Sequence, residues 1–461
     1  MKYLRIFFLS AVLLVTSIAV SQDTLLVDLQ ESLIMAESNN RLIRIFEYKI
    51  DHARKKLSEM KSHFYPRVIF EGTFAYNSDP NIYVKKGEMN HVYDDLIDVG
   101  WIDELLKEYF PLPPKDITLL YGDNWFYKTN LGLYQPISQI TTVNTGKKAA
   151  QADVRITETE KSNLVSEIRL GVIELYYGIL LESKREEAAS IELEYKKLQY
   201  QDARNAEKVG EILALDTEAL NAELFEKEQE LIQIRNRKES YMLTFRQLLG
   251  LDYNTVPIPA TVAFLSKEMA PLDDYIHIAS NGNYKLQISG LTLVKAGYGI
   301  DAAKKGYIPE LIGFAQYNYN KGIPLMADDY LLAGLNLKWT LVAAGERAAL
   351  RKQSNALYEE ALEDLEYEKE SVRNEVEKTY LDLIYAKKLL ATAGKALEAR
   401  QEEFRLAQNA RKEGLILEYK LLEARADLAW AECDILGARL NYQILMARMD
   451  RLTGEDISHP E

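Results

Sequence analysis

Two long stretches of the chain show the periodicity of helices that pack against other helices. The ranges 137–256 and 325–459 contain no proline. Each is interrupted once at a glycine, Gly210 and Gly414, which can end a helix with a positive φ. In the first stretch, apolar residues recur at steps of three, four and seven, at Leu164, Ile168, Val172, Leu175, Ile179, Leu213, Leu220, Leu224 and Leu231. The pattern predicts two very long helical hairpins with tight tips, and the alternative is a set of ordinary bundle helices.

Short segments of alternating polarity lie between the helical stretches. In 67–76 one face is apolar, whereas the other carries Arg67, Glu71 and Thr73. Three further segments, near 127–133, 311–319 and 331–339, keep the same alternation. Aromatic residues stand at the segment ends, at Tyr76, Trp125, Tyr127, Tyr319 and Trp339. Four strands of a transmembrane β-barrel with an aromatic girdle explain these features. The alternative is a half-buried sheet of a soluble protein.

The whole pattern is written twice. Residues 40–66 correspond to 283–309 at an offset of 243, and 135–250 correspond to 339–454 at an offset of 204. Two blocks in the same order indicate two copies of one supersecondary unit. The expected domains are a signal peptide at 1–21, a first repeat at 22–250, an inter-repeat, equatorial linker at 251–271, a second repeat at 272–454 and a tail at 455–461.

The difference between the two offsets indicates about 39 extra residues in the first copy. They form a predicted loop insertion at about 77–124, rich in Asp and Glu. Long outward loops are the rule in membrane barrels, so a solvated surface loop is the favoured interpretation. A plug at the channel mouth and a divalent-ion site are the alternatives, although the acidic residues lack the spacing of a calcium loop.

The beginning of the chain predicts export. Lys2 and Arg5 precede the largely apolar run 6–20, and small residues at Ala19 and Ser21 suit cleavage after Ser21. A membrane anchor is the alternative, but the run is shorter than the roughly 20 residues of a spanning helix. Cys433 is the only cysteine, so the exported chain has no internal disulfide.

Composition and motifs exclude several functions. The net charge of −14 argues against nucleic-acid binding. The five histidines show no paired-ligand spacing, and no nucleophile elbow, phosphate loop or dinucleotide fingerprint is present. We therefore expect no enzyme activity, no cofactor and no metal site.

Strand counting predicts an oligomer. Four strands of about ten residues are long enough to cross a bilayer, but spanning barrels need at least about eight strands. An open sheet edge is not viable in lipid, so several copies must combine their strands. A trimer gives twelve strands and a dimer gives eight, and both remain open at this point.

In its order of elements the chain resembles the TolC family of outer membrane efflux proteins. The order is signal, helix, strand after Phe64-Tyr65-Pro66, strand with Gly132-Leu-Tyr-Gln-Pro136, long helix, tip with Val209-Gly210 and returning helix, all duplicated. The resemblance covers essentially all of 23–454. It implies an α+β membrane protein: a homotrimer with a 12-stranded outer membrane β-barrel, four strands per chain, continued by a long periplasmic α-helical coiled-coil barrel.

The resemblance also implies a function. Such proteins are passive exit ducts of tripartite efflux pumps for small molecules, or alternatively of type I protein secretion. Their partners are a periplasmic adaptor, also called a membrane fusion protein, an inner-membrane transporter and outer membrane lipid. A periplasmic coiled-coil structural or adaptor protein without a barrel is the alternative from another class.

Family positions at the hairpin tips give the candidate site residues. Asp216 and Glu423 match acidic positions that form a periplasmic gate in the family, whereas Lys420 replaces an aspartate and would weaken an acidic ring. A solvated helix face is the alternative for each of these charges. The tip turns and their neighbours are the expected adaptor-docking residues, namely Gly210, Ile212, Leu213, Gly414, Leu415 and Ile416.

Overall fold

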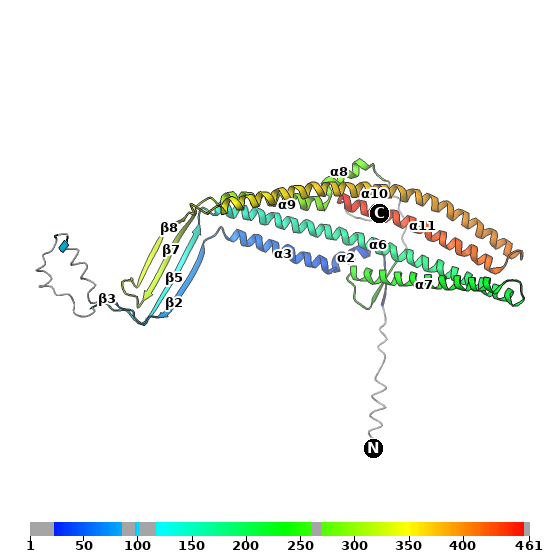
Figure 1. Ribbon diagram of the computed structural model, residues 1–461, viewed down its shortest axis with the longest axis horizontal. Coiled ribbons are helices and arrows are strands. Elements are labelled where there is room, and N and C mark those ends of the chain that lie inside the picture. Colours follow the sequence, from blue (N-terminus) through cyan, green and yellow to red (C-terminus); the bar gives the residue numbers. More distant parts are fainter. Residues whose placement is uncertain (1–22, 85–96, 99, 101–116, 261–268, 456–461) are drawn as a thin grey trace, which may run out of the picture. The chain divides into compact units, whose positions relative to one another are not determined.

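The computed structural model describes residues 23–84, 97–98, 100, 117–260 and 269–455 (Figure 1). The expected signal peptide and most of the loop insertion therefore lie outside the described residues, as do parts of the linker and the tail. The helices are α2 (Leu29–Asn39), α3 (Arg41–Ser62), α6 (Ile140–Lys208), α7 (Ala214–Leu248), α8 (Leu272–Gly282), α9 (Tyr284–Lys305), α10 (Glu346–Lys412) and α11 (Glu418–Thr453). The strands are β1 (Asp23–Val27), β2 (Arg67–Tyr76), β3 (Ile82–Val84), β4 (Ile117–Leu120), β5 (Trp125–Pro136), β6 (Thr255–Pro259), β7 (Glu310–Lys321) and β8 (Asp329–Lys338).

The chain divides into two compact units, which are described separately. We call them the helical unit, which consists of Met1–Ala53, Asp153–Val294 and Glu359–Glu461, and the sheet unit, which consists of Arg54–Ala152 and Lys295–Tyr358. The helical unit contains both hairpin tips. The sheet unit contains the four-stranded sheet.

The predicted long helices are confirmed. Helix α6 has 69 residues and α10 has 67, and each is followed across a short turn by a returning helix, α7 or α11. The predicted breaks at Gly210 and Gly414 are also confirmed, with φ angles of 80° and 74°. A positive φ costs glycine little, so the helix can end abruptly there. No helix in the described part of the chain is both long enough and apolar enough to pass through a membrane.

Four antiparallel strands form the sheet in the order β2-β5-β7-β8, which confirms the four strands expected from sequence (Figure 1). The register places Val68 opposite Leu133, and Leu133 opposite Ala315, so the apolar positions of neighbouring strands share one face. This face is open: Phe70 is 70% exposed and Leu335 is 67% exposed. Among the described residues, β2 and β8 are edge strands.

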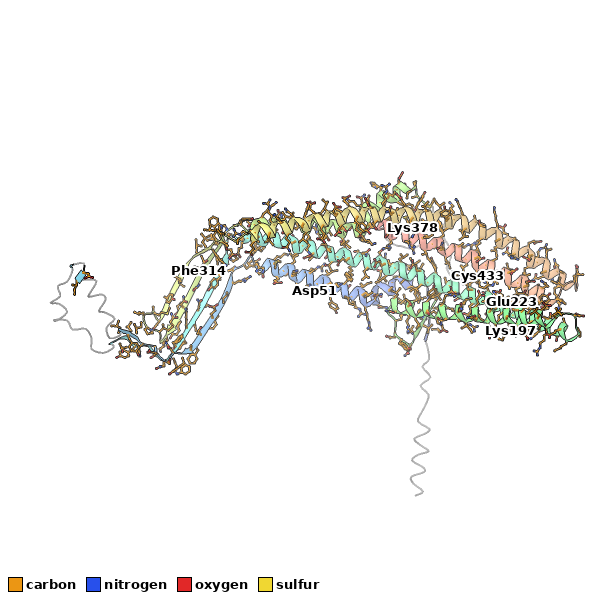
Figure 2. All side chains as sticks on the ribbon, in the orientation of Figure 1. Asp51, Lys197, Glu223, Phe314, Lys378 and Cys433 are labelled. Carbon is orange, nitrogen blue, oxygen red and sulfur yellow. The ribbon has the colours of Figure 1, made fainter. Side chains whose placement is uncertain are left out.

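The opposite face of the sheet is polar. Asn130 Nδ2 donates a hydrogen bond to Gln316 Oε1 at 3.0 Å, and Gln316 Nε2 donates to the Tyr134 hydroxyl at 3.1 Å. Asn318 and Asn320 are buried on this face, and Phe314 adds an aromatic ring (Figure 2). The alternation expected from the sequence therefore separates an exposed apolar face from a hydrogen-bonded polar face.

Two small sheets were not anticipated by the sequence analysis. Strand β1 pairs in parallel with β6, which lies in the segment expected to be a linker, and β3 pairs with β4 inside the expected loop insertion. The β1–β6 pair is held to α6 by Tyr176, whose hydroxyl donates to the carbonyls of Val27 at 3.2 Å and Ala260 at 2.7 Å. Burial, the largest cause, raises the pKa of Tyr176 to about 12.

Two equivalent asparagines join helix ends in the helical unit. Asn40 lies between α2 and α3, and its Nδ2 donates to the carbonyl of Leu248 at 3.1 Å, near the end of α7. Asn283 lies between α8 and α9, and its Nδ2 donates to the carbonyl of Leu452 at 2.8 Å, near the end of α11. In each case Oδ1 accepts a backbone N–H from the first turn of the next helix. We call these contacts the asparagine bridges.

Each asparagine bridge is accompanied by a close backbone approach. Gly250 and Gly454 follow α7 and α11 with φ angles of 65° and 71°. A side chain at Gly454 would place its Cβ 2.0 Å from the carbonyl oxygen of Gly282, and one at Gly250 would lie 2.7 Å from that of Asn39. Both positions therefore require glycine for conformation and for space.

Candidate functional site: the hairpin tips and their polar layer

The two hairpin tips have the same backbone geometry. At the first, the N–H of Gly210 donates to Glu207 at 3.0 Å and the N–H of Glu211 to Ala206 at 2.9 Å. At the second, Gly414 donates to Arg411 at 3.0 Å and Leu415 to Ala410 at 2.9 Å. These bonds satisfy carbonyls that would otherwise be left free at the helix end. The expected turn-forming role of both glycines agrees with this geometry.

Apolar side chains project from both tips. Leu213 is 68% exposed and Leu415 is 71% exposed, whereas Ile212 and Ile416 are half-buried. Val209, Leu215 and Leu417 are exposed as well. Clusters of exposed apolar residues on a soluble surface commonly mark sites of protein contact. The tips thus present two similar apolar surfaces at the ends of otherwise charged helices.

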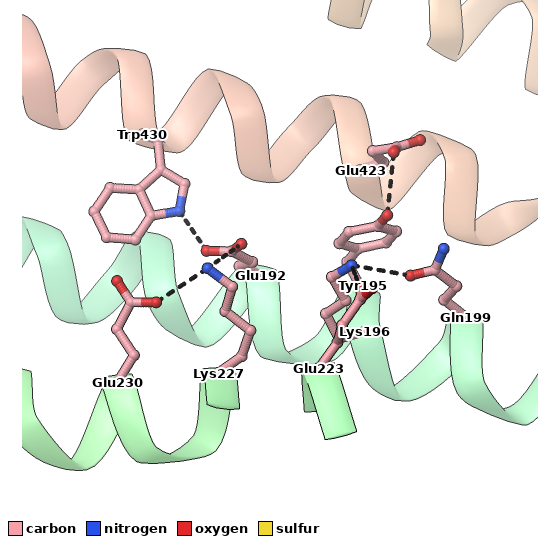
Figure 3. Close-up of polar contacts among 9 residues, drawn as sticks. All are labelled: Glu192, Tyr195, Lys196, Gln199, Glu223, Lys227, Glu230, Glu423 and Trp430. Carbon is pink, nitrogen blue, oxygen red and sulfur yellow. Dashed lines mark hydrogen bonds and ion pairs between the residues drawn. The ribbon is translucent and has the colours of Figure 1, made fainter. Parts of the chain in front are cut away.

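The structure brings two of the three gate candidates together. Lys420 Nζ lies 2.7 Å from Glu423 Oε2 on the same face of α11. Glu423 Oε1 also accepts a hydrogen bond from the hydroxyl of Tyr195 on α6 at 3.1 Å (Figure 3). The carboxylate is therefore shared between its own helix and the neighbouring hairpin.

Asp216 occupies a different environment. It lies exposed in the first turn of α7, where its negative charge suits the positive end of the helix dipole. Among the described residues, no hydrogen bond or ion pair joins its side chain to Glu423 or Lys420. The single chain therefore does not bring the three candidates into one cluster.

The contacts of Glu423 change the proton affinities of its neighbours. Burial on its own would raise the pKa of the Glu423 carboxyl, but hydrogen bonds from Lys420 and Tyr195 lower it. The hydrogen bond to Glu423 raises the pKa of Lys420, and burial together with the charge of Glu423 raises the pKa of Tyr195. All three shifts favour a charged Glu423–Lys420 pair beside a neutral tyrosine.

A second set of contacts lies farther from the tips and extends the connection to α7. The indole N–H of Trp430 on α11 donates to Glu192 on α6 at 2.7 Å, and Lys227 on α7 lies 2.9 Å from the other oxygen of Glu192 (Figure 3). Lys196 on α6 lies 2.5 Å from Glu223 on α7. We call Glu192, Tyr195, Lys196, Glu223, Lys227, Glu423 and Trp430 the polar layer.

Sequence reasoning missed most of the polar layer. Only Glu423 was among the expected site residues. Trp430 gives the one usable signal, because Trp is rare in this chain and an indole N–H that packs between helices needs an acceptor. Which carboxylate it reaches depends on the rotation of α6 against α11, which the sequence does not state. Cys433 lies one turn from Trp430 on α11 (Figure 2). It is buried and packs against Ala188 and Ala429.

The aromatic residues expected at the strand ends lie in two places. Tyr76, Trp125, Tyr127 and Tyr319 gather at one end of the sheet, where the rings of Tyr76 and Trp125 are 5.1 Å apart and those of Tyr127 and Tyr319 are 5.9 Å apart. Trp339 follows β8 at the opposite end, next to the Glu310–Lys338 pair of the sheet register. Aromatic residues thus stand at both ends of the exposed apolar face.

Comparison with known proteins agrees with this architecture. Residues 276–455 match the family model described as outer membrane efflux protein. The chain is 25% identical over 328 residues to outer membrane protein TolC of Vibrio cholerae, across 66% of this chain and 72% of that protein. Residues 276–455 thus form an outer membrane efflux protein domain, and the chain is a homologue of TolC. The chain is located in the outer membrane, with its helical part in the periplasm.

Solved structures of outer membrane channels share the fold of this chain. The CmeC outer membrane channel of Campylobacter jejuni superposes with a TM-score of 0.73 at 13% identity, over 92% of this chain and 85% of that one. The MtrE outer membrane channel of Neisseria gonorrhoeae, in its open state, gives 0.67 at 15% identity, over 93% and 89%. At these identities the likeness concerns the fold.

Proposed function

We propose that the chain is the outer membrane exit duct of a tripartite efflux pump, a homotrimer that passively conducts small molecules from the periplasm to the exterior. The observation that carries this proposal is the sheet, with its exposed apolar face and its two edge strands, β2 and β8. Unpaired strand edges are not tolerated in lipid, because each free backbone group costs several kcal/mol. Pairing β8 of one copy with β2 of the next closes the sheet, and three copies give a barrel of twelve strands.

The proposal includes an internal two-fold repeat. Its support is the order of elements, in which two shorter helices, strands of the large sheet, a long helix and a returning helix occur in α2–α7 and again in α8–α11. The asparagine bridges and the tip turns occur once in each half as well. The proposed boundaries are 22–250 and 272–454, with 251–271 between them and the insertion at 77–124 in the first repeat only. Three copies would then contribute six long hairpins to a periplasmic tunnel.

The hairpin tips are the proposed contact for a periplasmic adaptor. Their exposed leucines and valine, which flank the glycine turns, offer the kind of apolar surface that a helical partner covers. Through this adaptor the duct would be coupled to an inner-membrane transporter, which supplies the energy. Choice of exported compound then rests mainly with the transporter and adaptor.

The polar layer is the proposed closing device. Tyr195 and Trp430 join α11 to α6 through Glu423 and Glu192, and Lys227 extends the connection to α7. Opening the periplasmic end requires one hairpin to move away from the other, which breaks these contacts. Asp216, exposed beyond this layer, is proposed to act on cation entry alone.

Conductance in planar lipid bilayers tests the proposal. The purified protein should run as a heat-modifiable trimer extracted from outer membrane and should give a small, cation-preferring conductance. Recovery of the protein as a soluble monomer would contradict the proposal that it is an outer membrane duct. Deleting the gene for this protein should make the host cells more sensitive to small toxic compounds. Loss of a secreted polypeptide with unchanged sensitivity would instead support the protein-secretion alternative.

A further inference from the structure

A cavity of about 560 Å³ lies in the helical unit, between the last turns of α7, strand β6 and one residue of α6. One side is apolar and is formed by Met242 and Leu243 on α7 with Val256 and Pro257 on β6. The volume lies within the roughly 300–1,000 Å³ of typical small-molecule sites. None of its lining residues belongs to the hairpin tips or the polar layer.

The polar side of the cavity carries an excess of positive charge. Arg235, Lys238 and Arg246 line it together with Glu186 and Glu239, although the chain as a whole carries −14. Both oxygens of Glu186 are occupied, since Arg235 lies 2.8 Å from one and Lys238 lies 2.9 Å from the other. Hydrogen bonds from Lys238 and Arg235 lower the pKa of Glu186, which keeps this carboxylate charged and paired.

Arg246 is held in place but has no carboxylate partner in the described part of the chain. Its Nη1 donates to the carbonyl of Tyr253 at 2.7 Å, and its guanidinium lies 4.7 Å from the centre of the Tyr253 ring. Stacking on an aromatic ring restricts the guanidinium plane. The remaining N–H groups are left for another acceptor, and a planar fork of this kind matches a carboxylate.

We propose that this cavity binds an amphipathic carboxylate. The carboxylate pairs with Arg246, and the hydrocarbon part lies against Met242, Leu243, Val256 and Pro257. A ligand here contacts both α7 and β6, so it ties the end of the returning helix to the small β1–β6 sheet and stabilises the folded state by mass action. This binding site does not depend on the proposed exit duct, because it requires only the fold of one chain.

Titration calorimetry with the full-length protein in non-ionic detergent tests the site, with 4-phenylbutyrate as the probe and 4-phenylbutanol as its neutral counterpart. The acid should bind saturably, and the alcohol should bind at least about tenfold more weakly, because it cannot form the charge-assisted pair. Arg246→Gln should weaken binding of the acid by about tenfold or more. Arg400→Gln, which removes the same charge from α10, should leave the affinity unchanged.

A second variant tests the site independently in case Arg246→Gln fails to fold. Leu243 is 56% exposed, so Leu243→Glu should be tolerated by the fold. It places a carboxylate against the apolar wall, where it can pair with Arg246 itself, and it should abolish binding of the acid. Absence of saturable binding to the wild-type protein, equal affinity for acid and alcohol, or unchanged affinity in folded Arg246→Gln would each overturn the proposal.

Discussion

At the scale of single residues, Glu423 is the group whose role changes most once its surroundings are known. As one of many acidic residues on a long helix it would be a solvated charge. Its two hydrogen-bond partners, Tyr195 and Lys420, instead make it a link between α11 and α6. A hydrogen bond to a charged group is stronger than one between neutral groups, roughly 1.5–3 kcal/mol.

Tyr195→Phe should therefore loosen the periplasmic end of the duct. The change removes one hydroxyl, keeps the ring in its buried place and leaves Glu423 with Lys420 alone. We expect a higher mean conductance in planar bilayers with little loss of trimer. Tyr385→Phe, on the exposed face of α10, is the matched control and should behave as wild type. Equal conductance of the Tyr195 variant and the control would count against the polar layer as the closing device.

The lowered pKa of Glu423 gives a prediction for pH dependence. A carboxyl whose folded pKa lies below its unfolded value, about 4.3, contributes stability above that value and loses it as the pH falls through the folded pKa. The wild-type protein should have a higher melting temperature than Glu423→Gln at pH 7, and the difference should shrink below about pH 4. Scanning calorimetry of both proteins across this range measures it, and a constant difference would contradict the assignment.

At the scale of elements, the asparagine bridges explain how two hairpins of great length are held at their far ends. Each bridge joins three helix ends. The asparagine directly follows one helix, its amide N–H donates to the end of a second, and its side-chain oxygen caps the start of a third. A buried carbonyl that loses its donor costs about 1–3 kcal/mol. The bridge is thus a local contact that fixes where the returning helix ends.

Asn283→Ala should lower thermal stability more than the removal of a few side-chain atoms would suggest. It leaves the carbonyl of Leu452 unpaired and removes the cap of α9, a combined cost of about 2 kcal/mol. Asn40→Ala should act similarly on α7. Faster hydrogen exchange confined to the last turns of α11 or α7 would locate each effect. Asn281→Ala serves as control, because this exposed side chain donates to His277 within its own helix, α8. An equal effect of the control would argue against the bridges.

The elements also show why sequence reasoning succeeded in some places and failed in others. The long helices and the four strands carry their signal within a contiguous stretch, as proline-free periodicity or as alternation. The β1–β6 pair has no such local sequence signal. It joins five-residue strands that lie far apart in the chain, and one of them contains Pro257 and Pro259. The polar layer could not be predicted for a similar reason, because the rotation of three helices against one another decides which of its residues meet. At the tips, glycine geometry was predictable because it is local.

At the scale of the whole molecule, the difference between the two faces of the sheet determines whether the chain can form a membrane barrel. Leu335 and Leu332 lie three residues apart on β8, but the register puts Leu335 on the exposed apolar face with Gly313 and puts Leu332 beside Gln316 on the polar face. In a closed barrel the first would face lipid and the second the lumen. If both faces of the sheet were exposed to water instead, the two leucines would tolerate a charge about equally.

Leu335→Arg should sharply reduce the amount of trimer in the outer membrane, because a cationic side chain facing lipid near the middle of the bilayer costs roughly 2–4 kcal/mol for each copy. Three copies multiply that cost in the proposed trimer. Leu332→Arg introduces the same group on the same strand, and its guanidinium would reach water in the lumen, so trimer levels should stay near wild type. Detergent extraction of outer membranes, followed by electrophoresis with and without heating, measures both. Equal loss in the two variants would show that the faces of β8 do not differ in environment and would remove the lipid-facing assignment on which the twelve-stranded barrel depends.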